Sequence, residues 1–443
     1  MMRRYALAAI AALTIASIAA PSAAAQDALD VAAARRLVLG NSAALGKAAL
    51  AVETAVLAER AQAYAGMPSV GASASGSLAY DYSGSGSDAL GAAVKLSATQ
   101  TVFDGGRQSA TLKRASLASE EAREAMRAVR LDLIGQADSA FYAALKAALS
   151  VEAAADDLAA ARLRLRIAKA KADSGALAKS DYLMTESETA GYETSLIKAE
   201  RTLASARARL ASITGVRVGA ALEPIDFSAY DGLLLRLSAL DDSGAEALSA
   251  GVAALAADGN PELAGYAIAA RKADLSVRAA AAGYLPTVTA GLSQGVDWTD
   301  GDGLSLGDAD ISVSVSLDLD LWTTRNSVRS ASAAADSAAL DVSDGSRNLL
   351  LDIDVAVNEL LGAGRTIASS AKALEYAESN YDNALERFRL SSASASDLSG
   401  AEALVSVDRT ALISARYDFL SCLSTLRGLA GLESEDAILA LVP

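Results

Sequence analysis

The chain has 443 residues and a formal net charge of −15, and it contains no histidine. Without histidine, Ser-His-Asp and Cys-His catalysis and the usual zinc sites are excluded. The acidic balance argues against nucleic acid as a partner, because phosphate binding needs clustered Lys and Arg. Carboxylate pairs such as Asp241-Asp242 lie in loop-like sequence, with no neighbouring residues that would shift their pKa values for catalysis. We therefore expect no enzyme, no cofactor and no metal site.

Residues 1–25 are predicted to be a secretory signal peptide. Arg3 and Arg4 precede an uncharged apolar stretch at 5–20, and Ala23-Ala24-Ala25 offers a cleavage site. The alternative is an N-terminal membrane anchor, for which the stretch is barely long enough. Cys422 is the only thiol, so no internal disulfide can form in the oxidising compartment that a signal peptide implies. We expect an exported protein.

An internal repeat organises the rest of the chain. Gly40-Asn41-Ser42 is echoed by Gly259-Asn260-Pro261, and each half ends on a glycine, Gly215 or Gly431. Each half reads as helix, strand, strand, long helix, turn and helix. The predicted organisation is a first helix-strand-strand-helix repeat at 26–215, a linker or equatorial region at 216–258, a second repeat at 259–432 and a C-terminal tail at 433–443.

Membrane insertion, if it occurs, is expected through strands. After residue 25 no run of about 18 uncharged apolar residues follows, so transmembrane helices are not expected. Residues 311–321 alternate apolar with Ser and Asp, and at a tilt of about 45° they would cross about 25 Å. Residues 94–102 are a weaker counterpart. The predicted membrane-facing side chains are Val94, Leu96, Ala98, Ile311, Val313, Val315, Leu317 and Leu319.

The strands leave one alternative open, namely the edge of a soluble β-sandwich, which also has one apolar face. Four strands are expected in all, and about eight is the lower limit for a closed barrel, so a membrane barrel would need several chains. Tyr80, Tyr82, Trp298 and Trp322 are expected at strand ends, where aromatic residues often mark a membrane interface.

Two long helices are predicted, beginning near Arg107 and Arg325. In the second, apolar residues recur in steps of three and four from Leu349 to Phe388, which is the pattern of a coiled-coil seam. A helix over 325–390 would be about 100 Å long and must pack laterally on other helices. The alternative is an ordinary helical bundle or a soluble periplasmic coiled-coil adaptor.

Each long helix is expected to end in a helix-turn-helix tip. Gly175 fits a left-handed position after the first helix. Asp181 and Asp397 fit the first turn of the helices that follow, where capping by itself would explain an acidic residue.

The sequence resembles the TolC family of outer-membrane efflux proteins. The most specific parts are Thr99-Gln100-Thr101-Val102-Phe103-Asp104-Gly105-Gly106-Arg107 and the tip from Gly175 to Asp181. The resemblance implies a homotrimer in the cell outer membrane that extends into the periplasm. Each chain would give four strands to a twelve-stranded β-barrel, and its helical hairpins would build an α-barrel. A periplasmic adaptor protein and an inner-membrane pump would be the partners.

The resemblance also implies roles for residues at the tips. Gly175, Ala176 and Leu177 fall on the family's adaptor-docking tip, with Ser391 at the second tip where a glycine is usual. Asp397, with Asp181, is expected to line the pore aperture. The expected function is a trimeric exit duct for tripartite efflux or type I secretion, opened by rearrangement of the tip helices; the alternative is the soluble adaptor or scaffold. Besides Ser391, three departures from the family pattern are Ala393, Gly400 and the loosely matching 321–325.

Overall fold

The computed structural model describes residues 28–79, 89–216, 222–299, 303–390 and 392–442. The predicted signal peptide at 1–25 and Ser391 lie outside these residues. The chain divides into two compact units. We call residues 42–135, 231–369 and 418–443 the sheet unit, and residues 1–41, 136–230 and 370–417 the tip unit.

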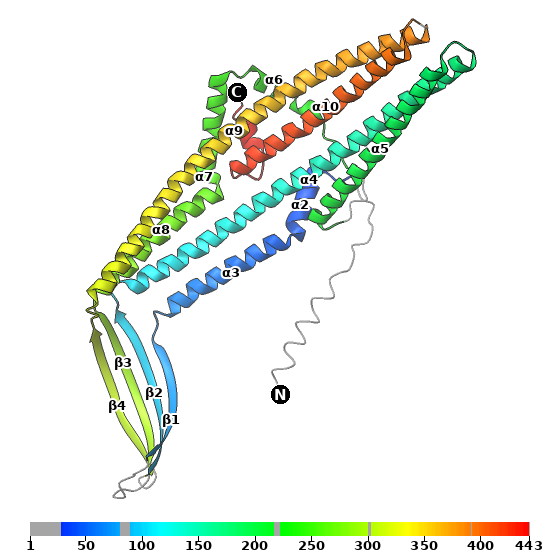
Figure 1. Ribbon diagram of the computed structural model, residues 1–443. Helices are drawn as coiled ribbons and strands as arrows, with labels where there is room; N and C mark the ends of the chain where they lie inside the picture. The colour runs from blue at the N-terminus through cyan, green and yellow to red at the C-terminus, as the bar shows by residue number, and fades with distance from the viewer. Residues whose placement is uncertain (1–27, 80–88, 217–221, 300–302, 391, 443) are drawn as a thin grey trace. The chain divides into compact units, whose positions relative to one another are not determined.

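The sheet unit contains a four-stranded antiparallel sheet with the order β1-β2-β3-β4 (Figure 1). β1 (Ser69–Ala79) pairs with β2 (Ala89–Phe103), and β3 (Thr287–Thr299) pairs with β4 (Gly303–Ser316). The two hairpins join through β2 and β3, so segments almost 200 residues apart in the sequence become neighbours. β1 and β4 are the two edges of the described sheet.

The other elements described in the sheet unit are helical. They are α3 (Ala43–Tyr64), α6 (Asp231–Ala239), α7 (Asp242–Gly259), α8 (Pro261–Ala281), α11 (Asp436–Leu439), a 3-10 turn η2 (Ala282–Tyr284), and parts of α4 (Arg107–Asp173), α9 (Leu321–Arg389) and α10 (Ala395–Leu429). Among the described helices, none combines the length and the apolar character needed to cross a membrane.

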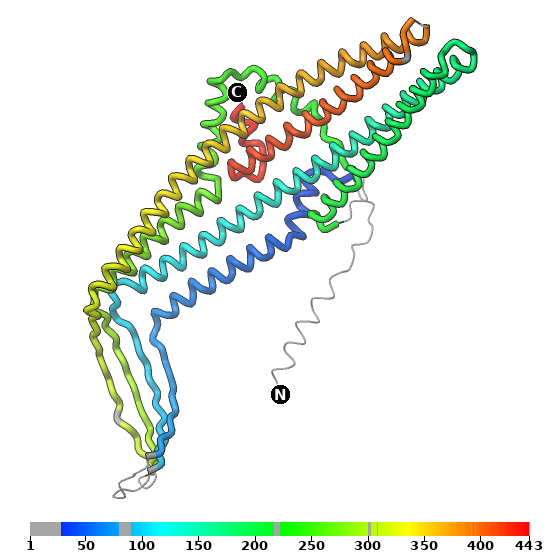
Figure 2. The backbone as a smooth tube through the Cα atoms, viewed as in Figure 1, coloured from blue at the N-terminus to red at the C-terminus, as the bar shows by residue number. Residues whose placement is uncertain are grey.

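The tip unit is helical. It holds α2 (Val31–Asn41), α5 (Lys179–Thr214), a 3-10 turn η1 (Phe227–Tyr230), and the remaining parts of α4, α9 and α10. α4 and α5 form one antiparallel hairpin and α9 and α10 form another, and both hairpins turn at the same end of this unit (Figure 2). Apolar side chains such as Phe141, Phe388 and Leu398 are fully buried in its core.

The order of elements repeats, as the sequence predicts, and the repeated asparagines show why the motif recurs. The Asn41 side chain donates to the Thr214 carbonyl at the end of α5, with a distance of 2.7 Å. The Asn260 side chain donates to the Leu429 carbonyl at the end of α10, at 3.0 Å, and accepts from two backbone amides of α8. Asn260, the N-cap of α8, therefore ties the start of that helix to the end of α10. Asn41, the last residue of α2, ties the junction between α2 and α3 to the end of α5.

The structure corrects the boundary between the last strand and the second long helix. β4 ends at Ser316, so Leu317 and Leu319 are not strand residues, and α9 begins at Leu321 rather than near Arg325. The cause is Asp320, whose carboxylate accepts from the Thr323 amide at 3.1 Å and caps the helix. The Leu-Asp alternation continues through this segment, but its second aspartate is used as a helix cap.

The first long helix begins differently. Asp104 accepts from the Gly106 and Gln108 amides at 3.0 and 2.7 Å. Gly105 and Gly106 have positive φ angles, and a Cβ on Gly105 would meet Leu285 at 2.9 Å. Only glycine fits there without strain. The second half has no glycine at this point, and its helix starts directly after the capping aspartate.

Candidate functional site: the sheet faces and the helical tips

The register of the sheet gathers its apolar side chains on one face. Ala98 lies opposite Leu292, and Leu292 lies opposite Ile311, so the side chains of three strands point to the same side. We call this the apolar face. Its described members are Val70, Ala72, Ala74, Leu78, Leu90, Ala92, Val94, Leu96, Ala98, Val288, Ala290, Leu292, Val296, Trp298, Leu304, Leu306, Ile311, Val313 and Val315.

The opposite face of the sheet is polar and built from small residues. Ser69 and Thr99 face each other with hydroxyl oxygens 2.6 Å apart, and Thr289 and Ser314 do so at 2.5 Å. Most remaining positions are Ser, Thr, Gly or Ala. The charged residues with a register partner on this polar face are Lys95, Asp297 and Asp310.

The apolar face is uncovered in the single chain. Ile311 is 83% exposed and Leu306 82%, and both belong to the edge strand β4. Soluble proteins bury such side chains, and an edge strand with exposed aliphatic residues is an aggregation site unless something covers it. Six of the eight residues predicted from the sequence to face a membrane lie on this face, namely Val94, Leu96, Ala98, Ile311, Val313 and Val315. Leu317 and Leu319 lie beyond the strand.

The first tip ends in a tight backbone motif. Gly175 has a φ of +77°, and its amide donates to the Ala172 carbonyl at 3.0 Å while the Ala176 amide donates to Lys171 at 2.8 Å. This pair of bonds is the Schellman motif, which closes a helix by a left-handed residue. Gly175 and Ala176 are exposed, and Leu177 is half-buried. The tip therefore presents small residues at a fixed turn.

The second tip begins its return helix with a capping box. Ser394 is the residue before α10, and its backbone amide and hydroxyl both donate to the Asp397 carboxylate, at 2.9 and 2.8 Å. The Asp397 amide donates back to the Ser394 hydroxyl at 3.1 Å. The bond from the Ser394 backbone lowers the pKa of Asp397, so this exposed carboxylate stays ionised.

Asp181 has a different environment from Asp397. It is exposed in the first turn of α5, and the residue before that helix, Ala178, makes no side-chain cap. The Ser180 hydroxyl donates to the Asp181 carboxylate at 3.3 Å. Both acids thus lie in first turns, as the sequence predicts, but capping accounts only for Asp397. At the second tip Ala393 is half-buried and Gly400 is exposed within α10.

A buried charge cluster links the two hairpins of the tip unit. Arg164 of α4 pairs with Glu402 of α10, and the Arg164 guanidinium lies 3.0 Å from the Glu188 carboxylate of α5. The Arg164 and Glu402 side chains are 2% and 5% exposed. One oxygen of Glu402 and two nitrogens of Arg164 have no hydrogen-bond partner among the described residues. Burial raises the pKa of Glu402 to about 7, against the lowering effect of Arg164.

Further polar residues surround this cluster. Burial raises the pKa of Tyr192 to about 12, and the nearby Glu402 carboxylate adds to the effect. Asp157 accepts from the Ser406 hydroxyl at 2.5 Å and faces Arg409 at 3.7 Å. Burial raises the pKa of Asp157 as well. A groove of about 320 Å³ opens beside these residues between α4, α9 and α10.

The buried charge cluster was not anticipated from the sequence, although a signal was present. Arg164 stands among Leu158, Ala161 and Ala168, all of which are buried. A charged residue at the core-facing spacing of a helix needs a buried partner of opposite charge. Such a partner can be suspected from one helix, but it cannot be identified without knowing which helices are neighbours.

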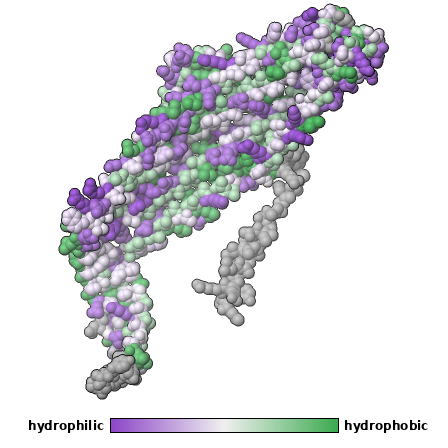
Figure 3. Space-filling view, viewed as in Figure 1, coloured by the Kyte–Doolittle hydropathy of each residue, from purple (hydrophilic) through white to green (hydrophobic). Residues whose placement is uncertain are grey.

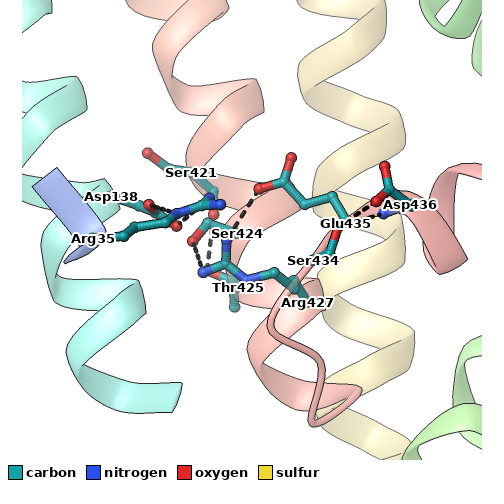
Figure 4. A network of polar contacts seen from close by, with 9 residues as sticks. All are labelled: Arg35, Asp138, Ser421, Ser424, Thr425, Arg427, Ser434, Glu435 and Asp436. Carbon is teal, nitrogen blue, oxygen red and sulfur yellow. Dashed lines mark hydrogen bonds and ion pairs between the residues drawn. The ribbon is translucent and has the colours of Figure 1, made fainter. Parts of the chain in front are cut away.

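A second polar network lies at the end of α10 in the sheet unit. Arg427 is 1% exposed, and its guanidinium donates to the Ser424 hydroxyl and the Glu435 carboxylate, both at 3.0 Å (Figure 4). Ser434 in turn donates to Asp436 at 2.6 Å. These bonds fasten the C-terminal segment against α10, and we assign them a structural role.

Comparison with solved structures gives outer-membrane channels from several bacteria. CmeC of Campylobacter jejuni is 15% identical, with 90% of this chain and 85% of that chain covered and a TM-score of 0.77. VceC of Vibrio cholerae is 17% identical, with coverages of 90% and 96% and a TM-score of 0.75. The open state of MtrE from Neisseria gonorrhoeae is 17% identical, with coverages of 91% and 89% and a TM-score of 0.76. At this identity the likeness shows the fold.

Comparison with curated protein sequences gives no significant match. The family model described as "Outer membrane efflux protein" matches residues 15–216 and 252–432, which is most of the chain and includes both repeats. Together with a sheet whose apolar face is uncovered and two long helical hairpins, this match gives the identification. The chain belongs to the outer membrane efflux protein family and is a channel protein of the outer membrane that extends into the periplasm.

Proposed function

We propose that three copies of the chain form a continuous exit duct, with a shared twelve-stranded β-barrel in the outer membrane and an α-barrel in the periplasm. The observation that supports this is the sheet itself. It has one apolar face, one polar face and two unpaired edges, β1 and β4. Lipid suits the apolar face, and water in a pore suits the polar face.

The unpaired edges support the trimer. Four strands cannot close on themselves, since about eight are needed for the smallest barrel. In a ring of identical chains, β4 of one protomer would pair with β1 of the next, which removes every edge. Three chains then give twelve strands, an even number as in single-chain bacterial barrels.

Disulfide cross-linking tests this arrangement directly. In a Cys422→Ser background, Ser312→Cys in β4 combined in turn with Ser73→Cys, Ser75→Cys and Ser77→Cys in β1 should give oxidised dimers and trimers on denaturing gels. The matched control is Ser97→Cys with Ser293→Cys, because these residues are register partners within one chain. The control pair should give only an internal disulfide. A protein that stays monomeric with every edge pair would contradict the shared barrel.

At the periplasmic end, we infer a narrow aperture and a docking surface. Asp397 and Asp181 are exposed acids in the first turns of α10 and α5, and three copies of each would form rings that attract cations. Gly175, Ala176 and Leu177 form the turn of the first tip, and the sequence places Ser391 at the second. We propose that these tips bind the periplasmic adaptor. Cross-linking from a cysteine at Leu177 would identify that partner.

We infer that the duct is passive and that an inner-membrane pump drives transport through it, in tripartite efflux or in type I secretion. Rearrangement of the tip helices would open it. The soluble adaptor alternative is not favoured, because it leaves the apolar face without a partner. We also propose that the protein has no catalytic activity. The proposed units are the repeats at 26–215 and 259–432, with 216–258 as the equatorial region and 433–443 as the tail.

A further inference from the structure

Three of the helix ends nearest the sheet, those of α4, α8 and α9, carry an excess of positive charge. In the stretches 107–119, 271–281 and 321–335 the only acid is Asp274, although the whole chain has 54 acidic and 39 basic residues. On the sheet side of these stretches, Asp104 and Asp320 act as helix caps. On the far side, Glu120 and Glu121 follow the first stretch and Asp336 follows the third. We call the following residues the basic collar: Arg107, Lys113, Arg114, Arg271, Lys272, Arg278, Arg325 and Arg329. Figure 3 shows hydrophilic residues gathered where the helices of the sheet unit meet the sheet.

Part of the basic collar surrounds a groove between α4 and α8. The groove has a volume of about 370 Å³ and is lined by Lys113, Ser116 and Leu117 from α4 and by Arg271, Asp274, Leu275 and Arg278 from α8. The three cationic side chains are exposed, and the two leucines are half-buried. A groove with cations at its rim and leucines in its wall suits a ligand that is anionic at one end and apolar at the other.

Two of the three cations of the groove have no ion pair among the described residues, and the third has a long one. The Arg271 guanidinium lies 3.8 Å from Glu120, a distance at which the pairing is weak. Lys113 and Arg278 have no ion pair with any other residue that the structure describes. Lys272, next to the groove, is already paired with Glu121 at 2.5 Å. The groove therefore keeps a net positive charge, because three cationic side chains and the single carboxylate of Asp274 line it.

The order of side chains along the sheet unit matches the layers of a bilayer. The apolar face comes first, and exposed aromatic residues follow at the junction with the helices, namely Tyr64, Tyr284 and Trp322. The basic collar comes next. Lys113 stands six residues into α4, about 9 Å along the helix axis, which is about the thickness of a headgroup layer. Aromatic residues prefer the interface, and long basic side chains reach lipid phosphates from there.

We propose that the groove between α4 and α8 binds the phosphate of an anionic phospholipid from the periplasmic leaflet, and that the basic collar thereby sets how deeply the sheet sits in the membrane. The inference rests on the proposed function in one respect, since it requires the apolar face to meet lipid. Free phosphate shares the anionic chemistry, but it would leave Leu117 and Leu275 without a role.

Native mass spectrometry of the full-length protein in mixed phosphatidylglycerol and phosphatidylcholine tests this site. The wild type should retain phosphatidylglycerol over phosphatidylcholine. The double variant Lys113→Gln, Arg278→Gln should retain about 25-fold less, since each basic residue near an anionic surface adds about fivefold to binding. The matched control is Lys198→Gln, Arg201→Gln on α5, where both side chains are exposed and unpaired among the described residues. This control should bind like the wild type.

Three results would overturn the lipid site. They are equal retention of the two lipids by the wild type, unchanged retention in the groove variant, and complete competition by millimolar inorganic phosphate. The same samples are checked for trimers that resist denaturing detergent. Trimers without a lipid preference would reject this inference alone, whereas a wild type that forms no trimer would reject the proposed function and this site with it.

Discussion

The sheet and the tip unit distribute their side chains in opposite ways. In the sheet, aliphatic residues such as Ile311 and Leu306 are more than four-fifths exposed. In the tip unit, charged residues such as Arg164 and Glu402 are at most 5% exposed. A single soluble domain would show the reverse in both places.

This difference shows which parts of the fold a single chain can pack completely. The tip unit completes its own interior, because each buried charge has an opposite charge from another helix. The sheet is not packed completely in a single chain, since its apolar face is exposed and both of its edge strands are unpaired. Stability measured at the tip should therefore respond to pH, whereas the state of the sheet should respond to lipid and to other protomers.

A charge on the apolar face should have the largest effect. Ile311→Arg places a cation near the middle of β4, where lipid-facing Arg costs about 2–4 kcal/mol in each chain. Detergent-resistant trimers should be lost or strongly reduced after refolding into vesicles. Ser312→Arg is the matched control, because its side chain points to the polar face. If both variants insert and assemble equally well, the apolar face does not meet lipid.

An intermediate effect is expected from Glu402, through pH. Its pKa is raised to about 7 from an ordinary 4.5, so protonation favours the folded state. The contribution of this protonation to the free energy of unfolding is on the order of 3 kcal/mol. It is fully present below pH 4.5 and is lost as the pH rises through 7. Arg164 faces Glu402 from α4, Glu188 from α5, and Asp157 from α4.

The measurement is the denaturant midpoint of the helical signal between pH 5 and 8. The wild type should become less stable across this range, and Glu402→Gln should remove most of the slope. Glu193→Gln, at an exposed pair with Arg162, should keep the wild-type slope. A Glu402→Gln protein with an unchanged slope would show that the buried charge cluster is not the titrating element.

The smallest effect should come from Asp397, where two roles can be separated. Asp397→Asn keeps an acceptor for the Ser394 amide, so stability should change little. The same variant removes three charges from the proposed ring, so the preference for cations in single-channel recordings should fall. Asp397→Ala should add a stability loss of about 1 kcal/mol. Equal ion selectivity in all three proteins would leave Asp397 as a helix cap only.

Much of the sheet could be predicted from the sequence, because a side-chain period of two fixes the face of each strand locally. Ile311, Val313 and Val315 alternate without interruption, and they share a face with Val94 and Leu96. The predicted end of this strand was wrong, because β4 ends at Ser316. Residues 317–320 keep the same alternation of Leu and Asp, but Asp320 caps a helix. Local periodicity cannot decide between a strand residue and a cap when the residue is an aspartate.

The tips were predicted in part. Gly175 predicts the first turn, because a glycine after a long helix favours the left-handed conformation. The capping box of Ser394 and Asp397 also has a sequence signature. The buried pairing of Arg164 with Glu402 could not be found, since the two residues are 238 positions apart and meet only after four helical segments have packed.

The polar face of the sheet has a consequence for selectivity. Glycines and short hydroxyl side chains line it, and its charges are few and mixed in sign. A wall of this kind offers passing molecules neither a shaped pocket nor a strong field. The choice of cargo therefore has to be made before a molecule reaches the membrane, and mutations along this wall should leave the range of exported compounds unchanged.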